Sequence, residues 1–116
     1  MYKQMIVSHA KIECEHIHDW NTFHDEFERV FGFPEFYGRN MNAWIDCMSS
    51  LATPDDGLTA IHCEKGKMIT IELNNVKTLK QNIPNIYNAV VESTAFVNWR
   101  LIEIGEQPVL GLSFSV

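Results

Sequence analysis

The chain has 116 residues, 46% of them hydrophobic and 21% charged, which is typical of one folded domain and excludes a disordered chain. Its 15 acidic and 9 basic residues give a formal net charge of −6. Nucleic-acid binding depends on clusters of Lys and Arg, and the sequence has none. The charge therefore argues against a direct nucleic-acid partner and is better suited to a basic protein partner, although solubility alone would also explain it.

No repeat, low-complexity tract or linker divides the chain, so we expect a single domain over residues 1–116. No apolar run reaches the roughly 18 residues that cross a membrane. Residues 1–7 are too short and too interrupted for a secretory signal. We therefore expect a cytoplasmic protein that has no membrane partner.

The first predicted elements are a strand and a helix. Residues 9–14 alternate between apolar and polar side chains, which predicts a strand, and the segment 5–7 either belongs to that strand or forms a short one of its own. A helix is predicted to begin near Asn21, with Thr22 and Asp25 resembling a capping box. Gly32 and Pro34 end this helix. Its apolar face consists of Phe23, Phe27, Val30 and Phe31.

The most informative segment follows, at residues 33–47. A turn from Pro34 to Gly38 carries two adjacent aromatic residues, and a second helix then begins with Asn40 as its cap. Helical spacing places one set of side chains in the core, namely Met41, Trp44, Met48 and Leu51. The opposite side, which faces solvent or a partner, carries Asn42, Asp46 and Ser49, with Ile45 on the border.

The middle of the chain is predicted to contain a turn and a hairpin. Residues 53–57 have the composition of a turn. The runs 58–63 and 68–73 flank the Gly-containing loop 64–67, a pattern that predicts a hairpin over 58–73.

The last third of the chain predicts two helices and a strand. A short helix containing Val76, Leu79 and Ile83 is capped by residues 74–75, and Pro84 lies in the first turn of a longer helix over about 85–104. Residues 109–116 alternate as a strand. The segment 100–104 would also serve as a strand paired with it. We favour the helix because it completes a strand–helix–strand crossover.

Cofactor and enzyme chemistry find little support. Cys14, Cys47 and Cys63 are widely spaced and are interpreted as free, buried thiols without disulfides. His16 and His18 would share a face with Cys14 in an extended strand, but no zinc-ligand spacing is present. The phosphate-loop and hydrolase motifs are absent from the sequence. We expect no cofactor, no metal and no catalytic residue.

Residues 33–51 resemble one family, the barstar-type ribonuclease inhibitors. That family carries the segment Pro-Glu-aromatic-Tyr-Gly-x-Asn-Leu-Asp-Ala-hydrophobic-x-Asp-Cys. The matching residues in this chain are Pro34, Glu35, Tyr37, Gly38, Asn40, Ala43, Asp46 and Cys47. Beyond residue 51 the resemblance rests on the order of the elements and on hydrophobic pattern.

The resemblance implies both a fold and a function. The fold is α/β, with a small, mainly parallel three-stranded sheet covered by helices, to which the hairpin at 58–73 would be an addition. The function is that of an intracellular immunity protein. Family members bind a ribonuclease in a one-to-one complex and block its active site, using carboxylates in place of RNA phosphates.

The resemblance also implies which residues contact the partner. By position, Asp46 matches the aspartate that fills the nuclease cleft, and Phe36 takes the place of a contact tyrosine. Asn42 stands for a second contact aspartate and Ile45 for a contact tryptophan. These differences suggest an inhibitor tuned to a different ribonuclease, or a module of the same fold that recognises a non-nuclease toxin or another protein.

Further contacts are expected around this set. Tyr37 either packs under the loop or contacts the partner, and Arg39 either pairs with Glu35 or contacts the partner. Ser49 completes the polar strip, and Ser50 stands with Leu51 where the family has a Gly-Trp pair. Glu103 is the nearest match to a glutamate that the family uses on its last helix.

Asp46 also has a physical argument of its own. An exposed aspartate inside a helix has below-average helix propensity and adds nothing to folding. Between Phe36 and Ile45 it would be a strong anchor for a guanidinium group. The alternative is that it is a solvated surface residue.

Overall fold

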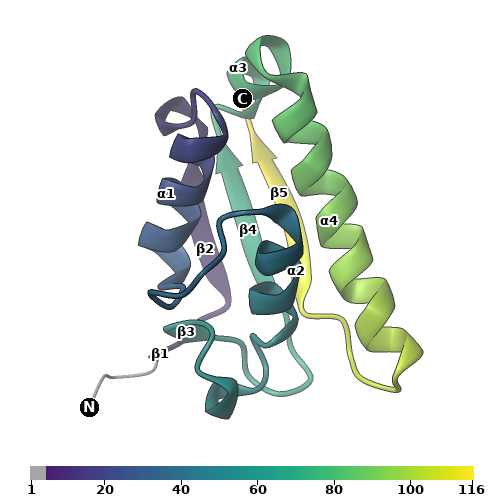
Figure 1. Cartoon of the computed structure of the whole chain (residues 1–116). Coiled ribbons are helices and arrows are strands. Elements are labelled where there is room, and N and C mark those ends of the chain that lie inside the picture. Colours follow the sequence, from purple (N-terminus) through teal and green to yellow (C-terminus); the bar gives the residue numbers. More distant parts are fainter. Residues whose placement is uncertain (1–4) are drawn as a thin grey trace.

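The computed structural model describes residues 5–116, and its helices and strands form two layers (Figure 1). The strands are β1 (Met5–Ile6), β2 (His9–Glu13), β3 (Ile61–His62), β4 (Ile69–Asn74) and β5 (Leu110–Ser115). The α-helices are α1 (Trp20–Phe31), α2 (Met41–Ser49), α3 (Val76–Asn82) and α4 (Pro84–Glu103). Two short 3-10 helices are η1 (Cys14–His16) and η2 (Pro54–Asp56).

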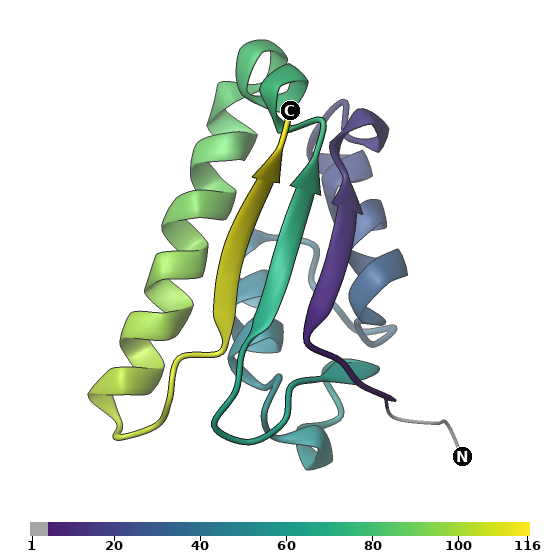
Figure 2. The same ribbon diagram turned by 180° about the vertical axis from the view of Figure 1, so that it is seen from behind.

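The main sheet has the order β2-β4-β5, and both of its pairings are parallel. A second, two-stranded sheet pairs β1 with β3, also in parallel. The helices α1, α2 and α4 all cover the same face of the main sheet, and the opposite face is open when the molecule is seen from behind (Figure 2). The α/β fold with a small parallel three-stranded sheet is therefore confirmed.

Alternation along β4 explains the open face. Ile69, Ile71 and Leu73 are buried under the helices, whereas Thr70 and Glu72 are half-buried on the other side. Parallel sheets usually have apolar residues on both faces because helices cover both. Here the polar outward side chains allow one face to remain in water.

The core lies between the sheet and the helices. Trp44 and Met48 from α2 are fully buried, and Trp44 meets Phe27 edge to face at 5.5 Å between ring centroids. The other fully buried large side chains are Phe23, Phe27, Phe31, Ile12, Leu51, Ile69, Ile71, Leu73, Leu79 and Ile86. Within the described residues no helix combines the length and apolarity needed to cross a membrane.

Several predicted elements are confirmed. The strand predicted at 9–14 is β2, which ends one residue earlier at Glu13, and the segment before it forms the separate strand β1. Pro84 is the first residue of α4, which continues to Glu103, so the alternative strand at 100–104 is wrong. Gly32 ends α1 in the left-handed conformation, with φ of 68°.

The predicted hairpin at 58–73 is wrong. Lys67 N–H donates to the Glu64 carbonyl at 2.9 Å, so the chain does turn there, but β3 and β4 belong to different sheets. β3 pairs with β1, and β4 is the central strand of the main sheet. Alternating side chains predict a strand but not its partner, and two parallel neighbours along both edges of β4 exclude an antiparallel partner.

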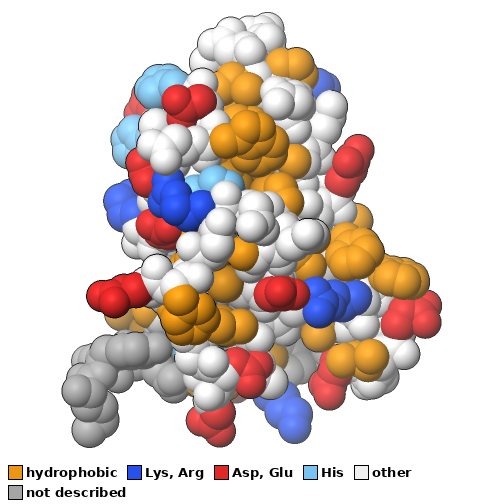
Figure 3. Space-filling view, viewed as in Figure 1, with side chains coloured by type: hydrophobic (Ala, Val, Ile, Leu, Met, Phe, Trp, Pro, Cys, Tyr) orange, Lys and Arg blue, Asp and Glu red, His pale blue; other side chains and the backbone are white. Residues whose placement is uncertain are grey.

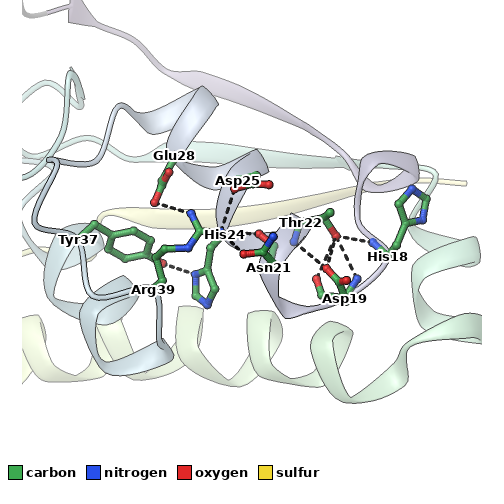
Figure 4. A network of polar contacts seen from close by, with 9 residues as sticks. All are labelled: His18, Asp19, Asn21, Thr22, His24, Asp25, Glu28, Tyr37 and Arg39. Atoms are coloured by element: carbon green, nitrogen blue, oxygen red, sulfur yellow. Dashed lines mark hydrogen bonds and ion pairs between the residues drawn. The ribbon is translucent and has the colours of Figure 1, made fainter.

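The predicted caps of two helices also need correction. Asp19 caps α1: its carboxylate accepts from Thr22 N–H at 2.8 Å, and the Thr22 hydroxyl accepts from Asp19 N–H at 3.0 Å (Figure 4). Thr22 is thus the third helical residue of a capping box whose N-cap, Asp19, lies three residues earlier than predicted. Asn75 precedes α3 in a left-handed conformation, and its side chain makes no capping hydrogen bond.

Candidate functional site

The segment from Phe33 to Ser50 contains most of the predicted contact residues, and α2 is its central element. Asn40 caps α2 as predicted, with its side-chain oxygen accepting from Ala43 N–H at 2.9 Å. Trp44 fixes the orientation of α2 because it is completely buried. The opposite side of the helix, with Asn42 and Asp46, is consequently exposed.

The two adjacent aromatic residues of the preceding loop point in opposite directions. Phe36 is 78% exposed, whereas Tyr37 is only 7% exposed. The Tyr37 hydroxyl lies 2.6 Å from Nδ1 of the buried His24, and its ring packs against Phe33 at 4.6 Å between centroids. Tyr37 therefore packs under the loop, and of the pair only Phe36 is available at the surface.

Arg39 is bound by other side chains of this protein. Its guanidinium contacts Glu28 at 2.8 Å, Asp25 at 2.9 Å and the Asn21 side chain at 2.8 Å (Figure 4). Glu35, the expected pairing partner, is not in this network. These three residues of α1 hold the loop against that helix, so Arg39 has a structural role there.

The two serines at the end of α2 differ in exposure. Ser49 is half-buried on the polar strip, where its hydroxyl donates to the Ile45 carbonyl at 2.6 Å. Ser50 is buried at 8% exposure, and its hydroxyl donates to Asp56 at 2.8 Å. The predicted contact at Ser50 is thus not at the surface, because the residue ties the end of α2 to η2.

The exposed Asp46 already has a partner that the sequence did not reveal. Its Oδ1 accepts a hydrogen bond at 3.0 Å from Nη1 of Arg100 on α4. The Asp46 side chain remains 61% exposed and the Arg100 side chain 41% exposed. No local spacing links residues 46 and 100. Only the packing of α2 beside α4 brings these charges together.

A groove of about 750 Å³ lies beside this ion pair, with Arg100 in its lining. It runs between the end of α2 and the C-terminal part of α4, and its lining includes Ser49, Arg100, Trp99 and Ile104. Glu103 also lines it. Trp99 is 55% exposed, and nothing in the sequence pattern distinguished it from the other apolar residues of this helix.

The cysteines are buried and unreactive in this fold. Burial and the neighbouring Asp46 carboxylate raise the pKa of Cys47 to about 11, and burial, with lesser effects of Glu13 and Glu26, raises the pKa of Cys14 to about 12. Each thiol therefore stays protonated near neutral pH, the form that is a poor nucleophile.

The cluster considered for a metal does not assemble. Residues 14–16 form a 3-10 turn rather than a strand, so Cys14 enters the core while His16 turns outward to Glu26, at 3.0 Å. Across residues 5–116, no group of three or more His, Cys, Asp or Glu side chains is placed to hold a metal ion.

The fold buries one side of α2 and leaves the other side exposed, with the acidic residue Asp46 near the middle of the helix. The family model described as Barstar (barnase inhibitor) matches residues 7–107. The chain therefore belongs to the barstar family, whose members are inhibitors rather than enzymes. No curated protein matches the sequence.

Proposed function

We propose that this protein binds a ribonuclease in a one-to-one complex and occludes its active site with α2 and the loop before it. Family membership supplies the class, a barnase-inhibitor-like protein-interaction module. The observation that carries the proposal is the position of Asp46, which projects from a rigidly packed helix and keeps 61% of its side chain exposed.

The chemistry of a nuclease cleft explains why this arrangement is suited to the task. An enzyme that binds RNA must present Arg, Lys or His side chains to phosphates. A carboxylate held on a rigid helix competes for the same cations, and it loses little conformational entropy on binding because Trp44 and Met48 already fix the helix. The net charge of −6 would also speed association with a basic enzyme.

The contact set in this proposal is Asp46 at the centre, with Phe36, Asn42, Ile45 and Ser49 around it. Phe36 contributes an aromatic surface that is 78% exposed. We place the protein in the cytoplasm, acting as an immunity protein without cofactor, membrane or direct nucleic-acid contact. Tyr37, Arg39 and Ser50 support the surface from behind.

Calorimetric titration into a panel of small microbial ribonucleases, including barnase-like enzymes, tests this proposal. We expect tight one-to-one binding and loss of ribonuclease activity. Asp46→Ala is expected to weaken binding at least about 100-fold, as central charged contacts do. The matched control is Asp55→Ala, which removes the same charge from the exposed η2 turn and should change affinity only about twofold. Equal effects of the two variants would contradict the proposal.

A second candidate is a module of the same fold that recognises a non-nuclease toxin or another protein. Asn42 and Ile45 favour it, because they replace a charge and an aromatic ring that the family resemblance predicts on this helix. Binding of a panel member without loss of its ribonuclease activity would favour this second candidate.

A further inference from the structure

The C-terminal half of α4 exposes large apolar side chains that the core does not use. Phe96 is 46% exposed, Trp99 55% and Ile102 56%, whereas Val97 and Leu101 on the inner side are buried. Phe96 and Trp99 lie together, with 5.6 Å between their ring centroids. Figure 3 shows hydrophobic side chains gathered over this part of α4. Contiguous apolar surface of this kind is characteristic of interaction sites.

This surface is continuous with the proposed contact helix. Ser49 of α2 and Trp99 of α4 line the same groove, and Arg100 lines it while bonding to Asp46. α2 also packs against part of α4 (Figure 1). A protein that reaches Asp46 would therefore meet the rim of the groove.

The size of α2 requires such an extension. Its 9 residues make a helix about 13 Å long, of which only the polar strip faces outward. A specific protein interface buries about 800 Å² on each partner. The strip and the single ring of Phe36 are too small for this, so the contact must spread onto a neighbouring element. The adjacent apolar surface is the one on α4.

The charge pattern indicates what the partner carries there. A partner cation that binds Asp46 competes with the Arg100 guanidinium, which lies 3.0 Å from the same carboxylate. In the complex, Arg100 and the partner's cation would both lie beside the Asp46 carboxylate. An anion supplied by the partner would balance this excess of positive charge. A partner surface with a cation for Asp46 and a carboxylate for Arg100 complements the pair as it stands.

We propose that Phe96, Trp99 and Arg100 form a second contact surface for the same protein partner, which inserts an apolar side chain into the groove and places a carboxylate against Arg100. The inference rests on the proposed function, because the partner is the protein that Asp46 recognises. It moves the aromatic part of the interface from α2, where Ile45 stands, to α4.

The test uses the same panel of ribonucleases and four variants. Trp99→Ala and Arg100→Ala are expected to weaken binding about tenfold or more, the effect of losing a well-packed interface contact. Phe114→Ala is the matched control because it removes another exposed aromatic ring, 52% exposed, from β5. The affinity of Phe114→Ala for the ribonuclease should equal that of the wild type. Asp46→Ala reports separately on the proposed function.

The outcomes separate the two proposals. If Asp46→Ala abolishes binding while Trp99→Ala and Arg100→Ala do not change it, the proposed function holds and this inference is overturned. If no panel member binds the wild-type protein, both are rejected. Tighter binding by Arg100→Ala also overturns the inference, because it shows that Arg100 merely competes for Asp46. The remaining alternative is that a second copy of this chain binds the surface, and analytical sedimentation tests it. A wild-type dimer that dissociates in Trp99→Ala would assign the surface to that second copy and overturn the inference.

Discussion

Arg100 donates a hydrogen bond to Asp46 across the boundary between α4 and α2, at 3.0 Å. The carboxylate that we propose as the central contact is thus already paired with a residue 54 positions later in the chain. Both side chains are well exposed, and exposed pairs of this kind contribute only about 0–1 kcal/mol to folding. Breaking the pair, as the proposed complex requires, would therefore cost little free energy.

Because this ion pair is weak, we expect that the proposed central contact, Asp46, can be removed without harming the fold. Asp46→Ala should change the free energy of unfolding by less than about 1 kcal/mol. Urea denaturation of the two proteins at neutral pH measures the difference. A loss of several kcal/mol would show that Asp46 is a structural residue, and any loss of binding in the variant would then have a different explanation.

Glu26 is expected to behave in the opposite way, because it is a buried carboxylate with several donors. It is 3% exposed and accepts from Glu13 N–H at 2.9 Å, from His16 at 3.0 Å and from Arg29 Nη2 at 2.6 Å. Burial alone would raise the pKa of Glu26, but the hydrogen bonds from Arg29, Glu13 and His16 outweigh it, and the net pKa lies below its ordinary value.

Glu26→Gln should therefore destabilise the protein by about 1–3 kcal/mol at neutral pH, because donors lose a charged acceptor. The Glu26 contribution is present above the ordinary carboxyl pKa and is lost as pH falls through the lowered value in the folded state. Denaturation at several pH values should show the variant and the wild type converging in acid. Glu15→Gln, at an exposed position on η1, is the control and should match the wild type throughout.

His24 predicts a second pH dependence, at higher pH. It is 3% exposed, and Nδ1 lies 2.6 Å from the Tyr37 hydroxyl. Burial first, and the nearby Arg39 charge second, lower the pKa of His24 from its ordinary value of 6.5. The unfolded chain therefore binds a proton before the folded protein does, and stability falls as pH drops below that ordinary value toward the lower folded one.

Replacing His24 should reduce the dependence of the free energy of unfolding on pH in this range. Between about pH 7.5 and 5.5, the wild type should lose stability relative to His24→Gln, which does not titrate. His18→Gln is the control, since His18 is exposed, and it should retain the slope of the wild type. Parallel curves for His24→Gln and the wild type would contradict the assignment.

Gly32 predicts a steric effect at the end of α1. It has φ of 68°, and a Cβ at this position would overlap the Cβ of Ala60. Ala60 N–H donates to the Phe31 carbonyl at 2.8 Å, so the two segments cannot move apart freely. Gly32→Ala should destabilise the protein by clearly more than about 1 kcal/mol. Gly57→Ala shares the positive φ of 70° but has open space around it, and should cost less. Equal losses would rule out the overlap as the cause.

Much of the fold was predictable because local signals agreed with the final packing. The Asn40 cap and the spacing of Trp44 and Met48 predicted both the start of α2 and its buried face. The crossover argument correctly favoured a helix up to Glu103 over a strand at 100–104. In these cases the information lies within a few residues of the element.

The error in strand pairing has a different cause, which is contact between distant segments. Alternation at 58–63 and 68–73 was real, but the partners of these strands lie elsewhere in the chain. The sequence left open whether Tyr37 packs under the loop or contacts the partner, and only the position of His24 decides between the two. The pairing of Arg100 with Asp46 follows from how α4 crosses α2, and no spacing in the sequence encodes it.

Across residues 5–116 every strand is paired in parallel, which has a consequence for how the chain reaches this structure. β2 joins β4 through the pair His9 and Thr70, and β4 joins β5 through Ile69 and Leu110. No ladder can therefore close by a short hairpin, and each must bring together segments separated by a helix or more. Helices can form in microseconds, whereas pairing strands that are far apart in the sequence is slow. We expect α1 and α4 to form before the sheet does, and β4 to remain without its second neighbour until the last strand docks.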